Sequence, residues 1–187
     1  MSKITKRSNT MEDSELVIKC LDDNSLAQEM LFNKYASKML GVCMRYFNSN
    51  SEAEDALQDG FIKVFQNLNS FSGNGSLEGW IRRIIVNTSL DAIRKNKKLQ
   101  LNTPIENVEF SLGNNNTILK SLEAEDLLKV LETLPLGYKT VFNLYAIEGY
   151  SHKEIAEKLN ININTSKSQL SRARKVLQNL VDKYNLK

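Results

Sequence analysis

Histidine and long apolar runs are the clearest shortages in this 187-residue chain. His152 is the only histidine, so a zinc site with several imidazoles is excluded, and a Ser-His catalytic relay would have to use this one ring. No apolar run approaches the ~20 residues of a membrane span, and we expect no secretory signal because no apolar h-region stands out. We therefore expect a soluble, cytoplasmic protein with no metal, no cofactor and no membrane insertion of its own.

Cysteine, proline and glycine are also scarce. Cys20 and Cys43 stand singly within helical patterns, so buried thiols are expected in place of a disulfide or a metal site. Only two prolines and eight glycines interrupt the chain, and no sustained alternating pattern indicates strands. The sequence predicts an all-α protein.

The helical pattern falls into two groups. Between them, residues 99–117 contain Pro104, Gly113 and three consecutive asparagines, which is typical of a flexible linker. We expect two small helical domains, 11–98 and 122–187, on either side of a polar linker, 99–121, with mobility between them. The predicted helices are 12–21, 25–47, 52–68, 77–95, 122–133 and 135–148, with Pro135 in a first helical position, followed by a helical pair within 151–177.

The distribution of charge is more informative than the modest net charge of +3. Basic blocks lie at 82–98 and 164–187, and acidic blocks lie at 52–59 and 123–126. Alternating patches of this kind indicate both a polyanion and a protein as partners.

The strongest single motif is a helix-turn-helix in residues 151–177. Ser151 and Glu154 have the spacing of a capping box, Asn160 suits a left-handed stop, and Asn162 can cap a second helix that begins near Ile163. His152, in the first turn of the first helix, is expected on the surface or at a DNA backbone. The predicted inward positions are Ile155, Ala156, Leu159, Leu170, Ala173 and Leu177.

The outward face of the second helix is short, polar and basic. Cations attract phosphates irrespective of sequence, and short amide or hydroxyl side chains near the start of a helix can reach base edges in a major groove. An ordinary solvated amphipathic helix is the alternative interpretation. The residues on this face are Asn164, Lys167, Ser168, Ser171, Arg172 and Lys175.

Residues 55–68 form an amphipathic pattern with an unusual polar side. Leu57, Phe61 and their helical neighbours share one stripe, and the opposite side holds Asp55, Gln58, Asp59 and Ile62. An isoleucine among acids is a candidate docking surface, although single exposed apolar residues are common on solvated faces.

Residues 79–98 combine an apolar stripe with a net charge of +5 from Arg82 to Lys98, since six basic residues stand against one acid. The stripe comprises Trp80, Ile81, Ile84, Ile85, Thr88 and Ala92, while Arg82, Arg83, Asn87, Asp91 and Arg94 lie elsewhere. A glycine-rich loop that starts at Phe71 precedes the helix. Aromatic and basic groups beside such a loop suit unstacked bases, although a helix end can also carry cations for dipole and solubility reasons.

Taken together, these segments resemble the extracytoplasmic-function (ECF) sigma factors, the two-domain branch of the sigma-70 family of bacterial transcription initiation factors. The resemblance covers about residues 16–180. The segment from Asp55 to Phe61 resembles the polymerase-binding helix, and Trp80, Asn87, Asp91 and Arg94 resemble the promoter-melting helix. Residues 134–156 resemble the start of the second domain, and residues 165–174 resemble its recognition helix.

The resemblance implies a DNA-binding protein that promotes transcription initiation without catalysis of its own. The first domain would bind core RNA polymerase through Asp55, Gln58, Asp59 and Ile62. It would hold the melted minus-ten strand of promoter DNA with Phe71, Ser72, Asn74, Arg83, Asn87, Asp91 and Arg94. The second domain would read the duplex minus-thirty-five element with Thr165 and the outward face of the recognition helix. The resemblance also implies an anti-sigma factor as a partner.

Two residues depart from the family pattern. Ser166 stands at an inward position where the family usually has an aliphatic residue, and a serine there can bond back to the carbonyl four residues earlier. Gln169 stands where an arginine is common, which removes one possible phosphate contact.

Other functions are weaker interpretations of the same residues. A dimeric helix-turn-helix regulator with an N-terminal sensing or interaction domain would need a dimer interface and a two-fold operator. An enzyme built on Ser151 and His152 would lack a third group near in sequence and a glycine-rich nucleophile turn. A protein-binding adaptor would leave the two basic helices unexplained.

Overall fold

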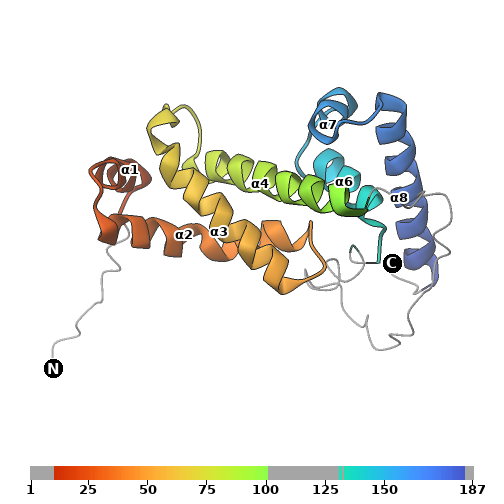
Figure 1. Ribbon diagram of the computed structural model, residues 1–187, viewed down its shortest axis with the longest axis horizontal. Helices are drawn as coiled ribbons and strands as arrows, with labels where there is room; N and C mark the ends of the chain where they lie inside the picture. Colours follow the sequence, from red (N-terminus) through yellow and green to blue (C-terminus); the bar gives the residue numbers. More distant parts are fainter. Residues whose placement is uncertain (1–10, 101–130, 132, 184–187) are drawn as a thin grey trace.

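The computed structural model describes residues 11–100, 131 and 133–183, and every regular element within these ranges is helical. The first domain contains α1 (Asp13–Leu21), α2 (Ser25–Met44), α3 (Asn50–Gln66), the 3-10 turn η1 (Leu68–Ser70) and α4 (Leu77–Gln100). Figure 1 shows α2, α3 and α4 packed together, with α1 crossing the far end of α2.

Close packing of α3 on α4 holds the first domain together. A Cβ atom at Gly60 would lie 2.3 Å from Cδ1 of Ile85, so the glycine allows the two helices to approach closely. Phe61 packs edge-on against Phe32 of α2, with 4.7 Å between the ring centroids. Cys20 and Cys43 are buried free thiols, as predicted, and burial raises the pKa of Cys43 to about 11.

The second domain contains α6 (Leu136–Phe142), the π-helical turn η3 (Asn143–Ile147), α7 (His152–Leu159) and α8 (Ile163–Lys183). The helix predicted over about 135–148 is present from Leu136 to Ile147, but its second part is π-helical. The N–H of Glu148 donates to the carbonyl of Asn143 at 2.9 Å, five residues back, and Gly149 then turns the chain with a φ of 76°. Pro135 is the N-cap of α6 and precedes its first helical residue.

The other helix ends differ from the predicted ones by a few residues. α2 ends at Met44, three residues early, α3 runs from Asn50 to Gln66, and α4 continues to Gln100. Most of the predicted linker and of the predicted helix 122–133 lies outside the described residues. None of the helices in the described ranges is both long and apolar enough to cross a membrane.

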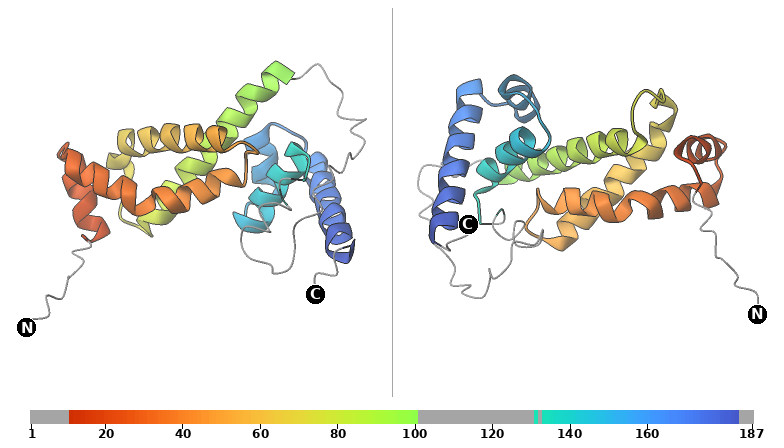
Figure 2. Two further views of the ribbon diagram at one scale, coloured as in Figure 1. Left: turned by 90° about the horizontal axis from the view of Figure 1, so that it is seen from below. Right: turned by 180° about the vertical axis from the view of Figure 1, so that it is seen from behind.

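The two domains pack against each other. In both views of Figure 2 the second domain lies beside α4, at the opposite end of the molecule from α1. Buried side chains of the first domain form one continuous apolar cluster with Val141, Leu144, Ile155 and Leu170 of the second. We call this the docked arrangement.

Candidate functional site

The acidic side of α3 is exposed as the sequence predicts. Asp55, Gln58, Asp59 and Ile62 all face solvent, and 54% of the surface of Ile62 is accessible, whereas Leu57 and Phe61 are buried beneath. The spacing of three and four residues places the four side chains on one face of the helix. An apolar side chain therefore stands exposed among carboxylates, and we call these four residues the acidic face.

The loop before α4 needs its glycines. Gly73 and Gly75 have φ angles of 75° and 101°, which other residues adopt only with strain. Ser72 and Asn74 are exposed at the tip of this loop. Phe71 is half-buried, and its ring packs against Trp80 with 5.6 Å between centroids, so only part of the ring is open to a ligand.

The predicted minus-ten residues on α4 lie on its outward side but are already in contact with other groups. Asp91 accepts hydrogen bonds from Arg94 and, at 3.1 Å, from Lys63 of α3. Burial alone would raise the pKa of Asp91, but these cationic donors outweigh it and hold that pKa below its usual value. Arg83 is exposed.

The second domain touches two of these predicted minus-ten residues directly. The Lys158 ammonium of α7 donates to Oδ1 of Asn87 at 2.9 Å, and Nη1 of Arg94 donates to the carbonyl of Lys158 at 3.2 Å. The basic helix of the first domain and the first helix of the helix-turn-helix are therefore in contact in the docked arrangement.

The helix-turn-helix has the predicted local structure. Ser151 and Glu154 form a reciprocal capping box at the start of α7. Asn160 ends that helix in the left-handed conformation, with φ 51° and ψ 52°, and Oδ1 of Asn162 accepts from the N–H of Asn164 at 2.8 Å. α8 begins at Ile163, as predicted.

The outward face of α8 is polar and accessible. Arg172 donates to the hydroxyl of Tyr138 at 3.4 Å, and the Ser168 hydroxyl donates to the carbonyl of Thr165 at 3.0 Å. The oxygen of Ser168 is then left to accept from a ligand. Thr165 is half-buried, while the exposed residues are Asn164, Lys167, Ser168, Ser171, Arg172 and Lys175.

Ser166 is fully buried, but it does not use the predicted bond to the carbonyl four residues earlier. Its hydroxyl shares a hydrogen bond with Nδ1 of His152 at 2.9 Å, which joins α7 to α8. His152 is half-buried and stacks on Tyr145 with 4.6 Å between centroids, so the prediction of a simple surface position is corrected. Burial, followed by the charges of Lys167 and Arg174, lowers the pKa of His152.

Sequence reasoning missed the group of charges that joins the domains. Glu148, directly after η3, accepts from Nε and Nη2 of Arg82 at 2.8 and 2.9 Å and from Nη2 of Arg45 at 3.1 Å. We call these three residues the ion triad. No local pattern could have revealed it, because its members come from α4, the end of α2 and the second domain.

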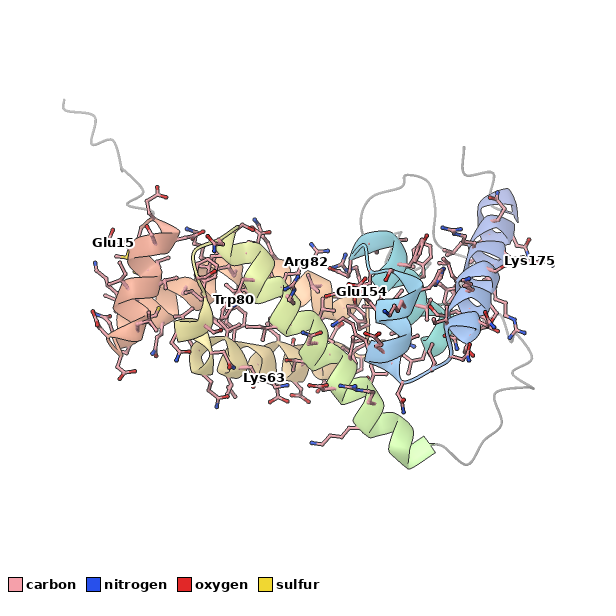
Figure 3. All side chains as sticks on the ribbon, turned by 90° about the horizontal axis from the view of Figure 1, so that it is seen from above. Glu15, Lys63, Trp80, Arg82, Glu154 and Lys175 are labelled. Carbon is pink, nitrogen blue, oxygen red and sulfur yellow. The ribbon has the colours of Figure 1, made fainter. Side chains whose placement is uncertain are left out.

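Two members of the triad, Arg82 and Glu148, line a cleft between the domains. Arg82 lines the cleft from α4 and Glu154 from α7, and both are labelled in Figure 3. The side chain of Glu148 is only 7% accessible. Hydrogen bonding to Glu148 raises the pKa of Arg82, whereas burial lowers the pKa of Arg45 despite the same carboxylate.

Within the described ranges, no three His, Cys, Asp or Glu side chains cluster as metal ligands. The structure places an acidic face, a basic helix beside a glycine loop, and a basic helix-turn-helix on separate elements. This combination defines a two-domain helical DNA-binding protein.

Comparisons with known proteins identify the family. Sigma-70 region 2 matches residues 31–99, and Sigma-70 region 4 matches residues 124–177. The chain is 32% identical over 155 residues to the ECF RNA polymerase sigma factor SigW of Bacillus subtilis, covering 77% of this chain and 83% of that protein. It is 28% identical over 182 residues to the ECF RNA polymerase sigma-E factor of Haemophilus influenzae, covering 91% and 96%.

A solved structure agrees with this result. The sigma factor RpoE of Bartonella quintana, crystallised in complex with the anti-sigma factor NepR, is 25% identical, with a TM-score of 0.50 over 82% of this chain and 96% of that one. The chain therefore belongs to the ECF sigma factors of the sigma-70 family. It is an RNA polymerase sigma factor that initiates transcription, and the family is non-enzymatic.

Proposed function

We propose that the three surfaces divide the work of initiation among themselves. The acidic face of α3 binds core RNA polymerase. The loop 71–76 and the outward side of α4 hold the melted minus-ten strand, and the outward face of α8 reads the minus-thirty-five duplex. Because polymerase works there, the place of action is the cytoplasm.

The observation that carries this proposal is the exposed Ile62 at the C-terminal end of the acidic face. Exposing an isoleucine to water costs free energy that burial in a complex recovers, and charges beside an apolar side chain set the orientation of a partner. The acidic face also carries the charge opposite to that of the two basic helices, so it suits a protein partner better than DNA.

Binding energy can offset the cost of unstacking bases at the proposed minus-ten surface. Separating a base from its stack costs a few kcal/mol, and stacking and hydrogen bonding in a protein pocket can offset that cost. Asn87 offers both a donor and an acceptor to a base edge, and the glycine loop permits close approach of its backbone.

Regulation by an anti-sigma factor is part of the proposal. The complex of the Bartonella quintana relative with NepR supports it. Such a partner would act by covering the acidic face or either DNA surface.

The test of the polymerase surface is the double substitution Asp55→Arg with Asp59→Arg. Both side chains are exposed, so the fold should survive. Placing cations where carboxylates are recognised should weaken binding to core polymerase at least tenfold, with an upper limit on the order of several kcal/mol. Affinity for core enzyme and helicity are measured on the same preparations.

The control for that test is Asp22→Arg with Glu29→Arg, which changes the net charge equally at exposed positions outside α3. Run-off transcription on a library of promoters provides the functional readout. A folded Asp55→Arg, Asp59→Arg protein with the affinity of the wild type would refute the assignment. A stable dimer on gel filtration that acts without polymerase would favour the alternative of a dimeric regulator.

A further inference from the structure

The ion triad puts two arginines of the first domain around one carboxylate of the second. Arg82 binds Glu148 through two donors, and Arg45 adds a third. A guanidinium fork that fits two carboxylate oxygens also fits two phosphate oxygens. Arg83 lines the same cleft, so a strongly cationic region would remain if Glu148 moved away.

The same docking occupies the neighbouring surface proposed for the minus-ten strand. Lys158 holds Asn87 at 2.9 Å, and Arg94 bonds to the backbone of Lys158 at 3.2 Å. A DNA strand that uses Asn87 and Arg94 must therefore displace α7. Glu148 leaves its arginines in the same movement, since it belongs to the same domain.

Buried polar atoms without hydrogen-bond partners weaken the docked arrangement, which makes such a movement feasible. Three buried side-chain atoms have no hydrogen-bond partner within the described part of the chain: Nε of Arg45, the hydroxyl of Tyr46 and Oδ1 of Asn143. Arg45 belongs to the ion triad, and Nδ2 of Asn143 donates to the carbonyl of Arg45 at 2.5 Å. Each unpaired buried group weakens the packed state relative to an open one in which water can reach it.

We propose that Arg45 and Arg82 form a binding site for a backbone phosphate of the melted minus-ten strand, and that Glu148 occupies this site in place of the phosphate while the domains are docked. The inference rests on the proposed function of α4, and it adds two residues and a competing carboxylate to it. Docking and binding of the minus-ten strand by the first domain are then mutually exclusive.

The experiment uses the full chain with the substitution Glu148→Gln, which keeps the shape of the side chain and removes its charge. The probe is a fluorescent single-stranded oligonucleotide with a minus-ten sequence, read by anisotropy, and domain separation is followed by small-angle scattering. If about one molecule in ten of the wild type is open, full opening tightens binding about tenfold. The radius of gyration should rise together with the affinity.

A matched control and a second arm make the result specific. Glu157→Gln makes the same charge change at an exposed position of α7 and should alter neither quantity. Adding Arg82→Ala to Glu148→Gln should keep the domains apart but remove most of the gain, and should reduce the log–log salt slope by about 0.7. Lys158→Met, which breaks the contact with Asn87, opens the domains by a second route and should also raise the affinity.

The outcomes separate this inference from the proposed function. Wild-type affinity in an opened Glu148→Gln protein, or an unchanged gain after Arg82→Ala, overturns the phosphate site while the minus-ten assignment stands. If the wild type and every opened variant fail to bind the oligonucleotide, both the assignment of α4 and this inference are wrong. Helicity measured on each variant shows that it is folded.

Discussion

At the scale of single residues, His152 and Ser166 show how one departure from a family pattern is accommodated. A serine in an apolar position leaves a buried hydroxyl that needs a partner, and the only histidine of the chain supplies it at 2.9 Å. The neutral ring is favoured here because burial and two nearby cations, Lys167 and Arg174, oppose its protonation.

This environment predicts a pH dependence of the second domain. Because the pKa of His152 is lower in the folded state than in the unfolded state, the unfolded chain binds the proton first as pH falls. Stability is therefore fully present above about pH 6.5 and decreases as pH falls from there to the folded pKa. The single histidine gives an unambiguous ring resonance, so titration by NMR should show a pKa below 6.5.

The control for this prediction is His152→Gln, which removes the titrating group and should flatten the dependence between pH 5 and 7. Amide exchange of α7 and α8 is the suitable measure of stability, because Trp80, the only tryptophan, reports on the first domain. A folded-state pKa at or above 6.5 would contradict the prediction.

The exposed residues of α8 predict a division between affinity and sequence preference. Arg172→Ala should weaken binding to many duplexes alike and reduce the log–log salt slope by about one, because a long exposed cation contacts phosphate. Ser168→Ala should change sequence preference at an unchanged slope, since its oxygen is free to accept near the start of the helix. Salt titrations on preferred and scrambled minus-thirty-five duplexes distinguish the two effects. A change of selectivity at constant slope in Arg172→Ala would reverse the assigned roles.

At the scale of elements, sequence predicts best where local chemistry decides the structure. The capping box at Ser151, the left-handed Asn160 and the start of α8 at Ile163 all follow from short-range rules, and the structure confirms each of them. The exposed acidic face follows from helical periodicity in the same way. The π-helical turn η3 could not be predicted, because the shift from α-helical to longer hydrogen bonds depends on how Val141 and Leu144 pack into a core formed by distant segments.

The turn between α7 and α8 provides a prediction at this scale. Asn160 has a φ of 51°, where an alanine side chain is strained by roughly 1 to 2 kcal/mol and a glycine is not. Asn160→Ala should destabilise the second domain by about 1 kcal/mol, and Asn160→Gly should be close to neutral. Amide exchange of Ile155 and Leu170 measures this difference. Equal losses in both variants would mean that the Asn160 side chain, and not its backbone conformation, stabilises the turn.

At the scale of the whole molecule, the docked arrangement is incompatible with the promoter contacts proposed for the two domains. The minus-ten and minus-thirty-five elements lie about 25 base pairs apart, which is roughly 85 Å along straight B-form DNA. In the docked arrangement Asn87 of the proposed minus-ten surface accepts a hydrogen bond from Lys158, a few residues before α8, the proposed recognition helix. Residues 101–130, fully extended, would reach roughly 100 Å, so the covalent connection permits the required separation.

The contact between the two domains could not be predicted from the sequence. Two domains and a polar connection can be inferred from composition, but the ion triad depends on how the domains meet, and residues 45, 82 and 148 carry no shared pattern. The contact is also easy to break, because no secondary structure has to unfold when Glu148 leaves Arg82.

The final prediction follows from this geometry. Dyes placed at Ser37→Cys of α2 and Asn179→Cys of α8, both exposed and neither among the residues assigned to the three surfaces, report the distance between the domains, while the buried thiols of Cys20 and Cys43 stay unlabelled. Energy transfer should be high in the free protein and should fall when core polymerase and promoter duplex are added together. Glu148→Gln should lower the transfer before any DNA is present, because it removes the ion pairs with Arg45 and Arg82 that hold the domains together. Constant high transfer would mean that the domains stay docked on the promoter, and constant low transfer would mean that they are already apart in solution.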